Sequence, residues 1–487
     1  MSPPRLLSRS PAALGLVTAL LAGCAAGPDY VRPALTPPAE FKEAGGPWKT
    51  ASPQPADANR PWWERYGDPL LNDLVGQANR QSLNIKIAEA QYRQARAAVQ
   101  YARSGYFPTL GANVSGGRGR SISNGQNVLS NSHSVGLDAS WEPDLWGQVR
   151  RSVEAGADTA QASAADLAGA RLSIQAELVQ DYLQLRIADA DKDLLTRTVD
   201  SYRKALALTR SQYGAGVATR ADVALAETQL KSAQAQAIDV GVTRSQLEHA
   251  IAILVGQAPS EFSIAVSAKG AETLKLPVVP TGLPSELLER RPDIAGAERR
   301  AAAANADIGV AQSAYFPALT LGATLGYTSA NFAQWFSAPA RIWSLGATLA
   351  GTIFDGGARA AKTDEARAAF DAAAGTYKQT VLAGFQEVED NLAALRILEE
   401  ERAVEDEAVA AAQVAERASL AQYRAGTATY LAVVTAQTLA LSNERSAVQL
   451  RGRQLVASAA LVKALGGGWT SAELDAEPVA QAGPAQR

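Results

Sequence analysis

The sequence is poor in the residues that most catalytic and metal sites require. Its 487 residues include one cysteine, Cys24, one methionine and two histidines, His133 and His249. A single cysteine excludes an internal disulfide and a CxxC site, and these isolated histidines exclude the HExxH motif of zinc peptidases. We predict His133 to lie in a solvated loop and His249 on a helix surface. The residues therefore indicate no enzyme, no metal site and no cofactor.

Two further absences narrow the class of protein. The formal net charge is only −3, from 46 basic and 49 acidic residues. This balance lacks the clustered Lys and Arg that bind phosphate backbones, so no nucleic-acid partner is expected. Beyond the first 24 residues, no segment approaches the ~20 consecutive apolar residues of a membrane-spanning helix.

The amino terminus has the pattern of an export signal. Arg5 and Arg9 precede an apolar run over 12–21, and the small residues of Leu-Ala-Gly lead to Cys24. Such a segment is typical of a signal peptide that is removed, here residues 1–23. It resembles a bacterial lipobox, which implies that Cys24 becomes the first residue and carries covalent lipid, palmitate included. The resemblance further implies, from Ala25 in place of Asp, sorting to the outer membrane.

Proline is distributed unevenly. Eight prolines fall within 28–61, too many for a helix or a central strand, and predict an extended tether over 24–61. No proline occurs between Pro143 and Pro259 or between Pro339 and Pro478, where good helix formers dominate. A single helix over 148–212 would be about 100 Å long. The sequence therefore predicts helices longer than a globular core requires.

An internal repeat organises the chain. Four residues of the first copy recur 210 positions later: Tyr213, Gly216, Thr219 and Thr228 become Tyr423, Gly426, Thr429 and Thr438. The tripeptide Tyr-Phe-Pro at 106–108 recurs at 315–317. A repeat of this length means that one structural unit of roughly 210 residues is used twice.

Apolar and polar residues alternate in four segments, which predicts one β-hairpin in each half. The clearest are 134–141, 319–327 and 345–353, and a weaker one covers 110–114. The first tip is predicted as a polar loop over 121–133, and the second carries Trp335 and Phe336. Nothing in the chain covers the apolar faces, as a membrane barrel would require, yet four strands are too few to close one. The barrel must be shared between chains; a soluble sheet packed on a helix is the alternative.

Six segments resemble the outer membrane factors of tripartite efflux systems, in their lipoprotein branch. They are GPDYVRP at 27–33, WWERYGDPLLNDL at 62–74, LPSELLERRPDIAGAERRAAAANADIGVAQSAYFPALTL at 283–321, IFDGG at 353–357, YRAGTATYL at 423–431 and ALGGGW at 464–469. The resemblance implies a mixed α and transmembrane β fold with two tandem repeats. Three chains, a homotrimer, would share a twelve-stranded β-barrel continued by a long α-helical barrel.

Combining the patterns with this resemblance gives a provisional division of the chain. We expect a signal peptide at 1–23, a lipidated tether at 24–61, a first repeat at 62–258 with its hairpin at about 109–143, a linker at 259–292, a second repeat at 293–469 with its hairpin at about 318–354, and a flexible tail at 470–487. Within the linker, Arg291 precedes Pro292 and must be extended. Asp293 is predicted to cap a helix that starts at Ile294.

The resemblance also implies a gate at the periplasmic end of the long helices, around the repeated Tyr213 and Tyr423. Asp222 matches the linking acid of the family and Tyr423 its tyrosine partner, while Leu431 matches an apolar constriction. Where related proteins often carry acids, this chain has Ala432 and Thr435. The alternative for Asp222 is a first-turn acid that stabilises the helix dipole.

The expected function is a passive exit duct for drugs or other small molecules. The partners that the resemblance implies are a periplasmic adaptor (membrane fusion protein), an inner-membrane transporter of the RND type and outer membrane lipid. Two alternatives remain at this point. The duct could instead serve type I protein secretion or metal-ion efflux, or the protein could be a structural envelope lipoprotein that conducts nothing.

Overall fold

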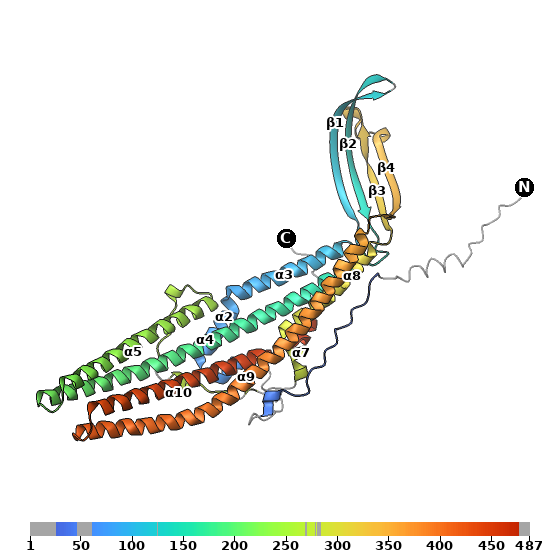
Figure 1. Ribbon diagram of the computed structural model, residues 1–487. Coiled ribbons are helices and arrows are strands. Elements are labelled where there is room, and N and C mark those ends of the chain that lie inside the picture. Colours follow the sequence, from blue (N-terminus) through green and yellow to red (C-terminus); the bar gives the residue numbers. More distant parts are fainter. Residues whose placement is uncertain are drawn as a thin grey trace, which may run out of the picture. The chain divides into compact units, whose positions relative to one another are not determined.

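The structure is a computed structural model that describes residues 26–45, 61–123, 125–267, 270–277, 279 and 284–476 (Figure 1). The chain forms two compact units. A sheet-bearing unit comprises Met1–Ala34, Tyr92–Ser163 and Gly296–Lys378, and a helical unit comprises Leu35–Gln91, Ala164–Ala295 and Gln379–Arg487. The predicted signal peptide, Cys24 and the tail beyond 476 lie outside the described residues.

The sheet has four antiparallel strands in the order β1-β2-β3-β4. They are β1 (Thr109–Ser123), β2 (Gln126–Trp141), β3 (Ala318–Ser329) and β4 (Arg341–Ala350). Leu137 pairs with Ala112 on one side and with Leu325 on the other, and Leu325 pairs with Trp343. Because paired residues project to the same side of a sheet, the apolar positions of all four strands share one face. The predicted alternation and the two hairpins are confirmed.

The predicted first tip is wrong. β1 continues to Ser123 and β2 begins at Gln126, so most of 121–133 is strand. The missed signal is Asn124-Gly125, a dipeptide that favours two-residue hairpin turns, and Gly125 has a positive φ of 74°. His133 accordingly lies in β2, paired with Ser329, and is not in a loop. The alternation predicted to reach Ile353 also stops early, because β4 ends at Ala350.

Four long helices form two matching pairs. α4 (Gln148–Gly214) and α9 (Ala358–Arg424) have 67 residues each, and α5 (Arg220–Leu254) and α10 (Tyr430–Ala464) have 35 each. α4 and α9 are each about 100 Å long, as the absence of proline predicted. None of the helices in the described ranges is both long and apolar enough to cross a membrane.

The shorter elements connect and flank these helices. They are α2 (Pro69–Gln81), α3 (Leu83–Ser104), α6 (Gly270–Thr273), α7 (Leu287–Arg290), α8 (Pro292–Ser313) and α11 (Ala472–Ala476), with short 3-10 turns at Lys42–Gly45, Trp62–Tyr66, Pro259–Glu261, Pro284–Glu286, Phe332–Gln334 and Ala338–Ala340. α2 starts as its sequence predicts, with Pro69 in the first turn and the Asp68 carboxylate accepting a hydrogen bond from Leu70 N at 2.9 Å.

At the start of α8, one prediction is confirmed and one is wrong. Arg291 is extended, with φ −101° and ψ 120°. The helix begins at Pro292, however, so Asp293 lies inside its first turn and does not cap it. The reason is the buried Arg291 guanidinium, which draws the Asp293 carboxylate to 2.7 Å and donates a second charged hydrogen bond to Glu387, also at 2.7 Å.

A buried ionic cluster fixes the segment that leaves the first repeat. The Asp189 carboxylate is fully buried and accepts hydrogen bonds from Arg244 at 2.7 Å and Arg186 at 3.0 Å. It also accepts the backbone N–H of Ser267 at 3.1 Å, and Arg186 donates to the Ala265 carbonyl at 2.9 Å. Glu248 balances the second arginine, because its carboxylate accepts a hydrogen bond from Arg244 at 3.1 Å. The two acids and two arginines offset one another's desolvation and bind the linker to α4 and α5.

Candidate gate at the ends of the long helices

The same tight turn ends each long helix pair. Gly216 has φ 75° after α4 and Gly426 has φ 74° after α9. Val217 N donates to the Gln212 carbonyl, and Thr427 N donates to the Gln422 carbonyl, both at 2.9 Å. This is the left-handed glycine cap that satisfies the last carbonyls of a helix. The repeat that the sequence shows is therefore also a repeat of backbone geometry.

Asp222 stabilises the start of α5. Its carboxylate accepts the Thr219 backbone N–H at 2.8 Å, and the Asp222 N–H donates to the Thr219 hydroxyl at 3.2 Å. These two reciprocal bonds form a capping box. Within the described part of a single chain, Asp222 and Tyr423 are not hydrogen-bonded. The geometry of one chain thus supports the alternative of a first-turn acid that stabilises the start of α5, here through a capping box. The link between Asp222 and Tyr423 stays a prediction.

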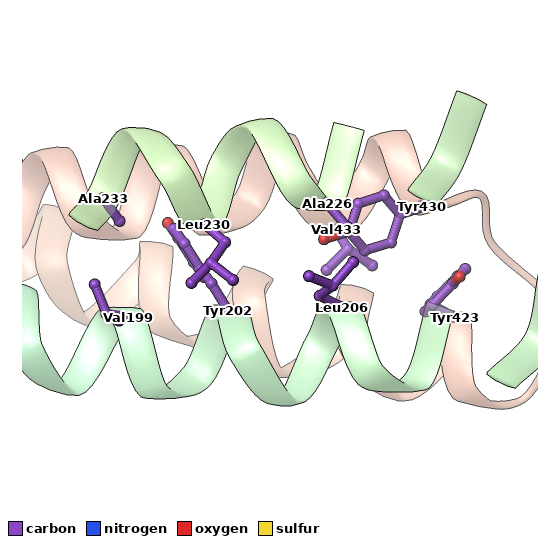
Figure 2. Packing of buried hydrophobic residues seen from close by; sticks show 9 residues of the cluster. All are labelled: Val199, Tyr202, Leu206, Ala226, Leu230, Ala233, Tyr423, Tyr430 and Val433. Carbon is purple, nitrogen blue, oxygen red and sulfur yellow. The ribbon is translucent and has the colours of Figure 1, made fainter. Parts of the chain in front are cut away.

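Tyr423 is buried between the two helix pairs. Only 6% of it is exposed, its hydroxyl donates to the Thr209 hydroxyl of α4 at 3.2 Å, and its ring lies 5.3 Å from that of Tyr430. Figure 2 shows the hydrophobic cluster around it. Its members are Val199, Tyr202, Leu206, Ala226, Leu230, Ala233, Tyr423, Tyr430 and Val433. The cluster joins residues of both repeats near their turns.

The cluster is uncharged at neutral pH. Burial, together with the neighbouring Tyr423, Tyr202 and Asp222, raises the pKa of Tyr430 to about 12. Tyr202 donates from its hydroxyl to the Gln437 carbonyl at 3.4 Å. Sequence reasoning missed Tyr430 and Thr209. Tyr430 could have been found, because Val433, Ala436 and Ala440 continue its face of α10 at helical spacing.

The other predicted gate residues lie at the surface of the chain. Leu431 is 59% exposed and Tyr213 is 49% exposed. Ala432 and Thr435 are also exposed, and the Thr435 hydroxyl donates to the Leu431 carbonyl at 2.9 Å. Leu431, Ala432 and Thr435 therefore share an uncharged, exposed face of α10, opposite the buried Val433.

The structure offers no alternative chemistry at this site. Within the ranges that it describes, no three residues of the types His, Cys, Asp or Glu come close enough together to hold a metal ion. The predicted residues thus divide into a buried tyrosine, a helix cap and an exposed apolar surface. Such a set can pack, align and obstruct.

Comparisons with known proteins are consistent along almost the whole chain. The family model described as outer membrane efflux protein matches residues 74–257 and 283–467, one segment for each repeat. The pyoverdine export outer membrane protein OpmQ of Pseudomonas aeruginosa is 31% identical over 469 residues, 94% of this chain and 97% of that protein. The toluene efflux pump outer membrane protein TtgC of Pseudomonas putida is 30% identical over 473 residues, 95% of this chain and 96% of that protein.

Solved structures give the same result. The outer-membrane channel OprN has a TM-score of 0.85 and 32% identity, covering 92% of this chain and 100% of that one. CusC, at 23% identity and a TM-score of 0.80, shares the fold. The two repeats, the long helices and the four strands are therefore features of a known channel architecture.

Proposed function

Because this chain belongs to the outer membrane efflux protein family, it is an outer membrane channel that extends into the periplasm, and we propose that it is the exit duct for small organic molecules in a tripartite efflux pump. The family is not enzymatic, and the alternative of a non-conducting envelope lipoprotein is wrong. The proposal extends to three identical chains, a periplasmic adaptor and an inner-membrane transporter of the RND type.

The four-stranded sheet is the observation that supports a barrel shared between chains. Its apolar face is open in one chain, where Leu110 is 74% exposed and Leu345 is 76% exposed. β1 and β4 are edges of the sheet, and lipid does not tolerate an open edge. Since membrane barrels need at least about 8 strands, more than one chain must contribute to a closed wall. Three chains, the number that the family resemblance implies, would supply twelve strands.

Light scattering on the detergent-purified protein tests this assembly. The expected mass is that of three chains after subtraction of detergent and lipid. A stable monomer whose sheet stays protected from hydrogen exchange would contradict the shared barrel, because the edges would then be covered within one chain.

The inner face of the sheet suits polar solutes of varied structure. The residues on the face opposite Leu137 are mostly Ser, Thr, Gly and Asn, with Asp138 as the one ionisable side chain on the four strands' inner face. Relatives are named for export of pyoverdine, toluene and antibiotics. We infer a small organic substrate for this chain. Expression of the chain with its adaptor and transporter in a host that lacks its own duct should restore efflux of such compounds.

The gate is proposed to close by packing. Leu431, together with Ala432 and Thr435, presents an uncharged surface at the start of α10, and the buried Tyr423 fixes the end of the preceding helix, α9, against α4. Three copies of this surface would narrow the duct without an acidic ring. Opening would require the helix pairs to separate at this end in an iris-like motion, induced by the adaptor and transporter.

Single-channel recording in planar bilayers tests the gate. Leu431→Ala should raise the conductance of the isolated trimer, whereas Leu439→Ala, which removes the same side chain from an exposed position two turns further along α10, should not. Asp222→Ala should also raise conductance if Asp222 links neighbouring helices. Unchanged conductance in Asp222→Ala would leave this residue with its capping role alone.

Cys24 is proposed to carry the lipid that anchors the chain. The residues that follow it are held in the sheet-bearing unit. Ala26 N donates to the Trp146 carbonyl at 3.0 Å, five residues after β2 ends, and the buried Arg151 binds Asp29 at 2.8 Å. The start of the described chain thus lies beside the segment between β2 and α4, which supports an anchor in the inner leaflet.

Intact-mass measurement tests the modification. The mature protein should begin at Cys24 and carry the mass of its acyl chains, and Cys24→Ala should lose that mass and the incorporation of labelled palmitate. A wild-type protein whose mass shows no acyl chains would contradict the proposed lipid anchor.

A further inference from the structure

Two arginines lie on the outward, apolar face of the sheet. In β1, Leu110, Ala112 and Val114 face outward, and residues at even positions continue that face because side chains alternate along a strand. Arg118 and Arg120 therefore project from the same side. Their paired residues in β2 are Asn131 and Leu129. Both arginines are exposed.

A third arginine joins them from the other edge of the sheet. Arg341 is the first residue of β4 and pairs with the outward-facing Tyr327. Among the described residues of the four strands, the outward face carries no Asp or Glu, since Asp138 pairs with Gly111 on the opposite face. None of the three arginines has an ionic or hydrogen-bonding partner within the described part of the chain. The outward face of the described strands thus carries three arginines and no acidic side chain.

The depth of these arginines follows from the register. Aromatic side chains mark the upper end of the apolar band: Phe336 lies 5.7 Å from Tyr327, and Phe332 lies 5.5 Å from His133. Such girdles lie at the membrane interface. Arg341 pairs with Tyr327 at this level. Arg118 lies four residues beyond the level of Tyr327, which is about 13 Å along a strand and about 10 Å in height at a tilt near 40°.

Arg341 therefore lies at the level of the girdle, where lipid headgroups begin, whereas Arg118 lies about 10 Å and Arg120 about 15 Å above it. The hairpin ends are at the far end of the sheet from α3, α4, α8 and α9, so in a channel whose helices enter the periplasm this level belongs to the outer leaflet. Three guanidinium groups without an acidic neighbour are suited to phosphate, which they bind with paired N–H donors.

We propose that Arg118, Arg120 and Arg341 form a surface that binds the phosphate groups of the outer-leaflet glycolipid, lipopolysaccharide. The inference rests on the proposed trimeric barrel. Closure of that barrel sets β4 of one chain beside β1 of the next, so that Arg341 lies on the strand adjacent to the two arginines of its neighbour. Each junction between chains would then hold one glycolipid headgroup, and the lipid would reinforce the seam.

Native mass spectrometry of the purified trimer with lipid A tests the proposal. Arg118→Gln/Arg120→Gln should weaken binding of bisphosphorylated lipid A at least about tenfold, as expected for the loss of two charged contacts per site. Arg341→Gln should weaken it less. The control Lys86→Gln/Arg93→Gln removes two exposed positive charges from α3 and should leave binding unchanged.

Further measurements identify the ligand and distinguish a failure of the lipid-binding proposal from a failure of the trimeric barrel. Dephosphorylated lipid A should bind all variants weakly, and inorganic phosphate should not compete, because it lacks the acyl chains by which the lipid also contacts the apolar face of the strands. Equal binding of lipid A by the wild type and the double variant would overturn the phosphate surface while the trimer stands. A wild-type monomer would instead overturn the shared barrel.

Discussion

The two turns at the ends of the helix pairs have the same backbone and different side-chain partners. In the first repeat, Thr219 and Asp222 cap α5 reciprocally, and Tyr213 is half exposed. In the second, Thr429 makes no side-chain cap, position 432 is Ala, and Tyr423 is buried against α4. The first turn is stabilised locally, whereas the second is stabilised by contact with the other repeat.

The two copies of the duplicated segment therefore differ in what they stabilise: one caps its own helix, and the other joins the two repeats. A capping box acts within a few residues and holds α5 whatever its neighbours do. The buried Tyr423 instead makes the position of α9 and α10 depend on α4, through the hydroxyl of Thr209. A motion of one helix pair relative to the other must therefore disturb the cluster of Figure 2, which has members in all four long helices.

The largest effect is expected from removing the buried tyrosine. Tyr423→Ala should lower the free energy of unfolding by about 3 kcal/mol, as for other large aromatic side chains cut from a core. Its counterpart Tyr213→Ala should cost no more than about 0.5 kcal/mol, because that ring is exposed. Denaturant unfolding of both variants in detergent measures the difference. Equal losses would show that the two turns are equivalent.

A smaller effect is expected from the capping box. Asp222→Ala should cost about 1 kcal/mol and speed hydrogen exchange at the Thr219 amide, which donates to the carboxylate. Asp222→Gln retains an acceptor for that amide and should protect it nearly as well. Hydrogen exchange resolved to single residues provides the measurement. Exchange at the Thr219 amide that is the same in all three proteins would contradict the capping role.

An acid introduced into the second repeat should give α10 the cap that it lacks. Ala432→Asp places an acid three residues after Thr429 and should stabilise the start of α10 by about 0.5 kcal/mol. It also adds a negative charge to the exposed face that carries Leu431, so the trimer should become more selective for cations. Reversal potentials under a salt gradient measure this change, with Ala432→Asn as the uncharged control. The same selectivity in both variants would place position 432 away from the duct.

The smallest effect concerns pH. Burial raises the pKa of Asp181 to about 6, with Glu177 adding to the shift, whereas the second repeat has Asn391 at the corresponding position. Because the folded protein keeps this proton while the unfolded chain releases it near pH 4, the stability contributed is present below that pH and declines as pH rises to about 6. Asp181→Asn should flatten this slope in thermal unfolding. Parallel slopes for the variant and the wild type would contradict it.

Much of the fold was predictable because its signals are local. Alternation over 319–327 predicted β3, and the absence of proline predicted the lengths of α4 and α9. The failures have equally local causes. The Asn124-Gly125 dipeptide favours a two-residue turn, and β1 and β2 therefore extend into the predicted loop. Asp293 looked like a cap, but the charge of Arg291, which reaches Glu387 far along the chain, decided its position.

The candidate site was less predictable, because its contacts join distant parts of the chain. Thr209 and Tyr423 are 214 residues apart, and no periodicity indicates that their hydroxyls meet. Asp222 was expected at Tyr423 by resemblance, but its nearest polar partner is only three residues away. A carboxylate at the start of a helix finds the free N–H groups beside it before it can reach another helix.

The sequence by itself determined the duplication, the alternating strands, the two long helix pairs and the absence of catalytic chemistry, since each depends on residue type and spacing along the chain. Only the tertiary structure decided which tyrosine is buried, which acid caps a helix and which arginines share the apolar face of the sheet. These depend on register and packing, which bring together residues that the chain itself keeps far apart.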